Sequence, residues 1–217
     1  MIKGLIFDMD DTLVDSLRVH RAAFKQALKN HKADISKIPE EVEATFPGRK
    51  GIEIAKYMVE YFSLDITPEA LVKERNELVE ESLTKVKPMP GFHKLMSFLN
   101  KKTIKFALAS SGTRAHIKTT LKAVNIENSF DAIVSGDEVH KSKPEPDIFI
   151  LAAKKLNLNP EECAVIEDAF SGIIAAKKAG MKAICIYHKQ PVTKQDLSEA
   201  DAILDNLGEI EEKIKEL

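Results

Sequence analysis

The chain has 217 residues, of which 44% are hydrophobic and 30% are charged, which is ordinary for a globular protein with one substantial core. Its formal net charge of −2 gives the whole chain no electrostatic affinity for nucleic acid or for an anionic membrane, so we expect neither as a partner. Cys163 and Cys185 each lie within an apolar run, which favours buried thiols over a disulfide or a zinc site.

The first residues contain one lysine before a short apolar run that ends in acids, which is not the pattern of a secretory signal. No apolar stretch approaches the roughly 20 residues that are needed to cross a bilayer. We therefore expect a cytoplasmic protein.

The first predicted strand, 2–8, leads directly into three acids, Asp8, Asp10 and Asp11, which are followed by Thr12. Carboxylates at the end of a buried strand repel one another and are costly to desolvate. A cost of this kind indicates that the acids serve a function.

The segment between Asp15 and Pro88 shows no convincing strand. The stretch 16–30 has apolar residues on one helical face, and 67–83 begins with Thr67 as an expected N-cap and a proline at the first helical position. We expect a helical domain at 16–87, inserted into a core formed by 1–15 and 88–217.

After this insertion, short apolar runs alternate with helical patterns. Because both faces of the runs are apolar, they are typical of strands in a parallel sheet that is covered on both sides. Gly180 is expected to end the helix before the run at 182–187. These runs lie at 104–110, 131–136, 163–168 and 182–187, with a weaker one at 201–205. The alternation predicts an α/β fold with a doubly wound parallel sheet.

Polar residues follow successive strands of this predicted sheet, where ligand sites of such folds lie. They are Asp8 and Asp10 after the first strand, Ser110 and Ser111 after the second, Lys143 after the third, and Glu167 and Asp168 after the fourth. Taken singly, such residues often cap helices or face solvent. Four groups at successive strand ends indicate one shared site.

These residues and their order resemble the haloacid dehalogenase-like (HAD) hydrolase superfamily, in the subgroup with a helical cap inserted after the first motif. The four motifs are DMDDT at 8–12, the serine of ALASSG at 107–112, the lysine of KSKPEPDIF at 141–149, and the acidic pair of VIEDAFSGIIAAKKAGM at 165–181. The resemblance spans essentially the whole chain and implies a Rossmann-like core. Asp11 stands where glycine is frequent in the family, and its side chain is expected to point elsewhere.

The resemblance implies Mg²⁺-dependent phosphoryl transfer. By the family's mechanism, Asp8 attacks phosphorus and becomes an aspartyl-phosphate, while Asp10 protonates the leaving oxygen and then activates water. Mg²⁺ prefers hard oxygen ligands. The expected ligands are Asp8, the backbone carbonyl of Asp10, and Asp168, with Glu167 binding directly or through water.

The same resemblance implies how a phosphate group is held. Lys143 is expected to offset the charge of the carboxylates and to contact the phosphate. Ser110, Ser111 and Gly112, with neighbouring backbone N–H groups, are expected to bind phosphate oxygens.

Three residues of the inserted domain, His20, Arg49 and Arg75, lie near positions where the cap of a β-phosphoglucomutase supplies polar contacts, so we expect them to bind substrate. The mutase has a lysine near the Arg75 position. It also has a lysine–asparagine pair after the second strand, where this chain has SSGTRAH. The second difference favours a phosphatase.

The predicted function is Mg²⁺-dependent hydrolysis of a small phosphorylated metabolite, of the sugar phosphate or phosphoglycolate class. A β-phosphoglucomutase-type mutase and a non-catalytic HAD-like binding protein are the alternatives, and the intact motifs disfavour the second. Asp10 and the Glu167–Asp168 pair argue against a dehalogenase, which lacks the second aspartate and needs no metal. A monomer or a weak dimer is expected.

Overall fold

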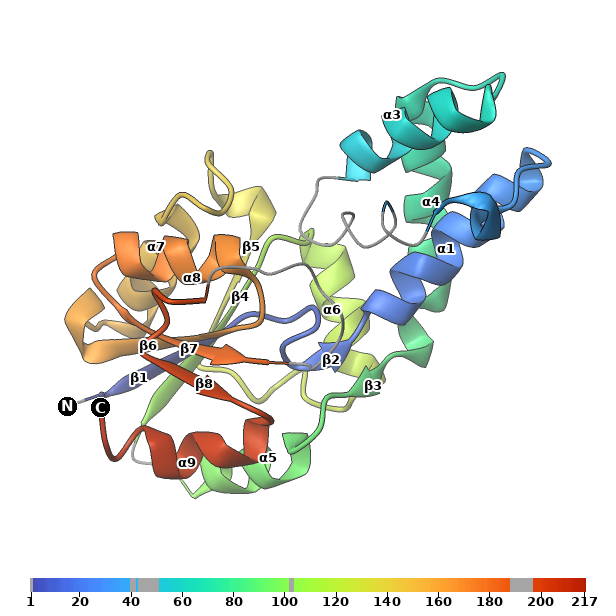
Figure 1. Ribbon diagram of the computed structural model, residues 1–217. Helices are drawn as coiled ribbons and strands as arrows, with labels where there is room; N and C mark the ends of the chain where they lie inside the picture. The colour runs from blue at the N-terminus through green and yellow to red at the C-terminus, as the bar shows by residue number, and fades with distance from the viewer. Residues whose placement is uncertain (1, 40–41, 43–50, 102–103, 188–196) are drawn as a thin grey trace.

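The computed structural model describes residues 2–39, 42, 51–101, 104–187 and 197–217 (Figure 1). Its main feature is a six-stranded parallel sheet with the strand order β5-β4-β1-β6-β7-β8. The strands are β1 (Gly4–Phe7), β4 (Lys105–Ser110), β5 (Ala132–Ser135), β6 (Cys163–Glu167), β7 (Lys182–Ile186) and β8 (Ala202–Leu204). All six strands that the apolar runs predict are confirmed.

Helices cover both faces of this sheet, as the alternating pattern predicted (Figure 1). Along β1, Leu5 and Phe7 belong to the apolar core on one face, and Ile6 belongs to the core on the other. The first core includes side chains of α5 (Phe92–Asn100), α6 (Arg114–Ala123) and α9 (Ile210–Lys213), and the second includes those of α7 (Asp147–Leu156) and α8 (Phe170–Lys178). Single 3₁₀ turns lie at η3 (Gly136–Glu138), η4 (Pro160–Glu162) and η5 (Leu207–Glu209).

A second, two-stranded sheet lies where the chain leaves and re-enters this core. Val14–Asp15 (β2) pairs antiparallel with Lys87–Pro88 (β3). The sequence pattern does not predict this ladder, because two residues are too few to show a strand period. The pairing holds the two ends of the 16–87 segment side by side.

Every element described between β2 and β3 is helical. These elements are α1 (Leu17–Asn30), η1 (Ile35–Lys37), α3 (Gly51–Phe62), α4 (Pro68–Ser82) and η2 (Leu83–Lys85). Side chains of α1, α3 and α4 form an apolar cluster that includes Phe24, Met58 and Leu71, whereas Leu83 of η2 belongs to the core of the large sheet. The helices α1, α3 and α4 stand apart from that sheet (Figure 1). Thr67 caps α4 as predicted, because its hydroxyl accepts a hydrogen bond from the Ala70 N–H at 3.2 Å.

In the part of the chain that the structure describes, no helix combines the length and the apolar character that a membrane span requires.

Gly91 and Gly180, which each lie next to a helix, have positive φ angles, but their surroundings differ. Gly180 follows the last turn of α8 with φ +77°, and a Cβ there would meet no atom within 4 Å. Gly91 precedes α5 with φ +80°, and a Cβ there would overlap the backbone nitrogen of Gly208 and lie 2.6 Å from Oδ1 of Asn206. Gly91 therefore permits close contact between α5 and η5.

This difference predicts unequal effects of the same substitution. Gly180→Ala should lower the free energy of unfolding by about 1 kcal/mol, the cost of placing an L-residue in the left-handed region. Gly91→Ala should cost about 3 kcal/mol or more, because backbone atoms must also move. Urea denaturation of both variants measures the two costs, and equal costs would contradict the role of the contact with η5.

Candidate active site

The candidate site is centred on a buried ion-pair group at the carboxyl ends of β1 and β6. The ammonium group of Lys143 donates to Oδ1 of Asp8 at 2.5 Å and to Oε1 of Glu167 at 2.7 Å. It also lies 4.8 Å from the centre of the Phe149 ring. The sequence expected Lys143 to offset the carboxylates, and the structure brings these three charged groups together.

The charge balance of this group is fixed by burial and by the acids around it. Burial alone would lower the pKa of Lys143, but attraction to Asp8 and Glu167 outweighs burial and raises it. For Asp8, burial is the largest effect, and with repulsion from Glu167 and Asp10 it raises the pKa despite the attraction of Lys143. Lys143 is thus held as a cation. Its single positive charge is not enough to stabilise the ionised form of Asp8 beside the other acids.

Glu167 uses both of its carboxylate oxygens within the protein. Oε1 accepts from Lys143, and Oε2 accepts from the backbone N–H groups of Asp168 and Ala169 at 2.9 and 2.8 Å. Gly172 makes room for this arrangement, since a Cβ there would overlap Oε1. This geometry favours an indirect role for Glu167, which orients Lys143 and the turn after β6.

Asp168 lies beside Thr12, a residue of the first motif whose contact the sequence does not reveal. The fully buried Thr12 hydroxyl donates to Oδ1 of Asp168 at 3.0 Å. Burial, and then repulsion from Glu167, Asp8 and Asp11, raises the pKa of Asp168 well above its ordinary value. A further cation near Asp8 and Asp168 would relieve this repulsion.

The donor set at this point suits Mg²⁺. Among the described residues, no three His, Cys, Asp or Glu side chains form a group that could hold a metal ion. The ligands expected from the family resemblance are Asp8, Asp168 and the backbone carbonyl of Asp10, with Glu167 binding directly or through water. Because both oxygens of Glu167 accept hydrogen bonds within the protein, Asp8 and Asp168 are the carboxylates left for direct binding. Mg²⁺ commonly takes one or two carboxylates and retains several waters. The residues present therefore fit this ion.

The loop after β4 carries the expected phosphate-binding residues. The buried Ser110 hydroxyl accepts from the Gly112 N–H at 3.1 Å, and the Gly136 N–H donates to the Gly112 carbonyl at 3.0 Å. A Cβ on Gly136 would overlap the carbonyl of Ser111. The end of β5 therefore packs directly against this loop.

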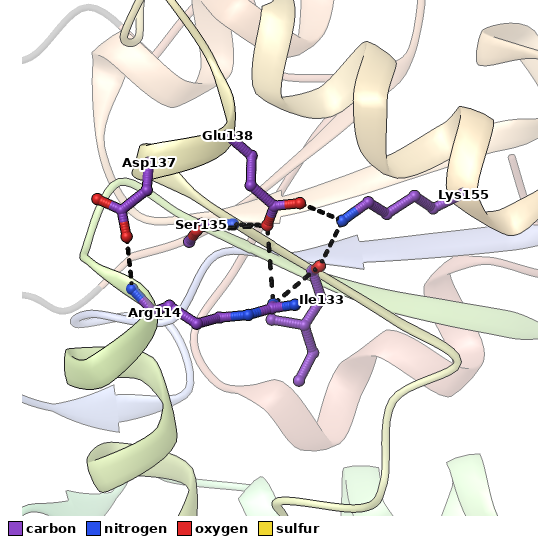
Figure 2. A network of polar contacts seen from close by, with 6 residues as sticks. All are labelled: Arg114, Ile133, Ser135, Asp137, Glu138 and Lys155. Carbon is purple, nitrogen blue, oxygen red and sulfur yellow. Dashed lines mark hydrogen bonds and ion pairs between the residues drawn. The ribbon is translucent and has the colours of Figure 1, made fainter.

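A polar network joins the end of this loop, at Arg114, to β5 and η3 (Figure 2). The backbone N–H of Arg114 donates to Oδ2 of Asp137 at 2.8 Å, and its guanidinium donates to the Ile133 carbonyl at 3.2 Å. Glu138 accepts from the Ser135 N–H at 2.9 Å and pairs with Lys155 at 2.5 Å. These contacts attach the start of α6 to β5.

Asp10 contacts a histidine that the sequence does not single out. Nε2 of His116, the third residue of α6, lies 3.3 Å from Oδ1 of Asp10. Burial would raise the pKa of Asp10, but the hydrogen bond and attraction from His116, with a smaller effect of Ser16, lower it. The signal in the sequence was a histidine three residues after Thr113, the helix-capping residue that follows β4.

Helices α1 and α4 bring His20 and Arg75 next to His116. The Arg75 guanidinium donates to Nδ1 of His20 at 2.7 Å, so His20 accepts there and is neutral. Burial, and then the nearby Arg75 charge, lowers the pKa of His20 to about 4. The His20 ring stacks on that of His116 with centroids 6.4 Å apart. Arg49, the third expected residue, lies outside the described residues.

The side chain of Asp11 binds the backbone directly after β2. Its φ of +59° is in the left-handed region, where aspartate and glycine are both tolerated, which accounts for the glycine that is frequent here in the family. Its Oδ1 accepts from the Ser16 N–H at 3.1 Å, beside β2. Asp11 therefore shapes the turn after β1.

Comparison with known proteins identifies the family. The model of the haloacid dehalogenase-like hydrolase family matches residues 5–186, and the chain belongs to this family. It is 33% identical over 184 residues to the fructose-1-phosphate phosphatase YqaB of Escherichia coli, covering 83% of this chain and 94% of that protein. It is 32% identical over 207 residues to the β-phosphoglucomutase of Bacillus subtilis, covering 90% and 88%.

A solved structure resembles the fold of this chain along nearly its whole length. The crystal structure of CbbY from Rhodobacter sphaeroides in complex with phosphate superposes with a TM-score of 0.80 at 26% identity, covering 97% of this chain and 96% of that one. The chain is thus an enzyme of a family that contains both hydrolases and phosphotransferases.

The raised pKa of Asp8 predicts how stability depends on pH in a chelating buffer. Between its ordinary 3.8 and about 8, folded Asp8 retains a proton that the unfolded chain has released. Its contribution to stability is therefore complete below 3.8 and is lost as the pH rises through 8. The free energy of unfolding should fall across this window.

Asp8→Asn removes the titrating group and serves as the comparison. In chelator at pH 8, we expect this variant to exceed the wild type in free energy of unfolding by about 1 kcal/mol or more. Urea denaturation at pH 5.5 and pH 8 measures how the free energy of unfolding changes with pH in the wild type and in the variant. An equal change in both proteins would show that Asp8 is ionised throughout this range.

Proposed function

We propose that this enzyme is a Mg²⁺-dependent phosphatase that hydrolyses small phosphomonoesters of the sugar phosphate class. The observation that carries the proposal is the buried contact between the Lys143 ammonium group and Oδ1 of Asp8, with Asp10 two residues away. Lys143 binds one oxygen of Asp8 and leaves the other for attack on phosphorus. The named activities of the relatives support the substrate class.

In the first half of the proposed reaction, an oxygen of Asp8 forms a bond to phosphorus as the bond to the substrate oxygen breaks. Asp10 donates a proton to that leaving oxygen. In the second half, water attacks phosphorus, Asp10 accepts its proton, and the bond to Asp8 breaks to regenerate the carboxylate. Asp8, Asp168 and the backbone carbonyl of Asp10 would hold Mg²⁺, which would supply positive charge that offsets the negative charge of the phosphate group.

We further propose that 16–87 acts as a cap domain, joined to the core at the β2–β3 ladder. His20 and Arg75 support this idea, because both lie on cap helices and contact the group that includes His116 and Asp10. Nε of Arg75 is buried without a hydrogen-bond partner among the described residues. A guanidinium in this state is suited to an anionic or hydroxyl-rich substrate.

The nucleophile is tested by a matched pair of amide substitutions. Asp8→Asn should lower kcat for phosphate release about 1,000-fold or more, because the amide is nearly isosteric but does not attack phosphorus. Asp11→Asn makes the same change in the same motif and should retain most of the activity, since asparagine tolerates the left-handed backbone. Phosphate release from fructose 1-phosphate in Mg²⁺ measures both. More than a tenth of wild-type kcat in Asp8→Asn would refute the assignment.

A β-phosphoglucomutase is the second candidate, favoured by the relative in Bacillus subtilis. Both enzymes would form the same aspartyl-phosphate, but a mutase must exclude water from it. We expect phosphate release to exceed isomerisation when β-glucose 1-phosphate is supplied with glucose 1,6-bisphosphate. A dehydrogenase specific for glucose 6-phosphate measures the isomerisation, and a large excess of that product would establish the mutase instead.

A further inference from the structure

His116 is held in a fixed position by contacts on two sides of its ring. Its backbone N–H donates to the Thr113 hydroxyl at 3.2 Å, which fixes the residue in the first turn of α6. A Cβ on Gly112 would lie 3.0 Å from Cδ2 of His116, so the glycine allows the ring to approach the phosphate-binding loop. The ring also stacks on that of His20 with an interplanar angle of 8°.

The ring nitrogen that faces Asp10 acts as a donor. A carboxylate oxygen accepts hydrogen bonds, so Nε2 of His116 carries the hydrogen that points to Oδ1 of Asp10. The side chain of His116 is only 13% exposed, so water competes weakly for this donor. The contact leaves Oδ2 of Asp10 to exchange a proton with the substrate or with water.

We propose that His116 is a positioning residue that orients Asp10 for proton transfer, an inference that rests on the proposed phosphatase function. His116 belongs to the core helix α6, so its contact with Asp10 requires no substrate. It therefore remains available after the dephosphorylated product leaves, when Asp10 must accept the proton of the attacking water. In that step the water oxygen binds phosphorus, its proton moves to Asp10, and the bond between phosphorus and Asp8 breaks.

Two substitutions separate positioning from packing. His116→Phe retains an aromatic ring that can stack on His20 but lacks the donor. His116→Gln loses the ring but places an amide N–H near the position of Nε2. If His116 acts by orienting Asp10, the Gln variant should be the more active of the two, whereas a role in packing predicts the reverse order.

The leaving group adds a second readout. With a nitrophenyl phosphate, the first half-reaction needs no proton from Asp10, because nitrophenolate is a good leaving group. In the second half-reaction, Asp10 must still accept the proton of the attacking water. His116→Phe should therefore release a rapid burst of one nitrophenolate per active site within about threefold of the wild-type rate, followed by steady turnover reduced about 100-fold. With fructose 1-phosphate, the leaving oxygen needs a proton from Asp10, so His116→Phe should show no burst of fructose release. The burst amplitude counts folded sites, so partial misfolding does not affect the comparison.

His93→Phe is the matched control, because it makes the same change on the exposed residue of α5 and should leave all rates unchanged. His116→Gln should recover to within about fivefold of wild-type turnover. Equal loss of the burst rate and steady rate in His116→Phe, or a Gln variant no better than Phe, would overturn the positioning role. A wild-type enzyme that releases no phosphate from any small ester would instead overturn the proposed function itself.

Discussion

The ammonium group of Lys143, buried between Asp8 and Glu167, is the interaction on which the carboxyl edge of the sheet depends. Two parallel strands bring their acids to the same edge, and burial makes ionised acids costly there. One lysine offsets part of this charge, but Asp8 and Asp168 both retain raised pKa values. The remaining excess of negative charge accounts for the expected affinity for a divalent cation. In the proposed function, folding and catalysis therefore use the same charged groups.

Close backbone approaches give the site its shape. Gly172 admits the Glu167 carboxylate, and Gly136 admits the Ser111 carbonyl, so a single methyl group at either position would displace a residue of the site. Asp11 supplies a left-handed turn and then binds Ser16, which directs the chain toward β2. These positions affect the chemistry only through the side chains and loops that they allow to pack closely.

Contacts between α1, α4 and α6 connect the inserted helices to the candidate acid–base residue. Arg75 binds His20, His20 stacks on His116, and His116 donates to Asp10. Arg75 and His20 lie on α4 and α1, whereas His116 lies on α6 and Asp10 follows β1, so a displacement of α1 or α4 would change the surroundings of Asp10. In the proposed function, substrate binding and proton transfer therefore share one set of contacts.

The sequence by itself determined the six strands of the sheet, the helical insertion and the order of the motif residues. Apolar periodicity and residues that follow strands are local properties, so they can be recognised without the fold. Only the tertiary structure decided that Glu167 uses its oxygens on Lys143 and backbone N–H groups, that β2 pairs with β3, and that His116 faces Asp10. Asp10 and His116 are 106 residues apart in the chain. Their contact depends on how the start of α6 lies against the turn after β1, and this arrangement cannot be recognised from the local sequence.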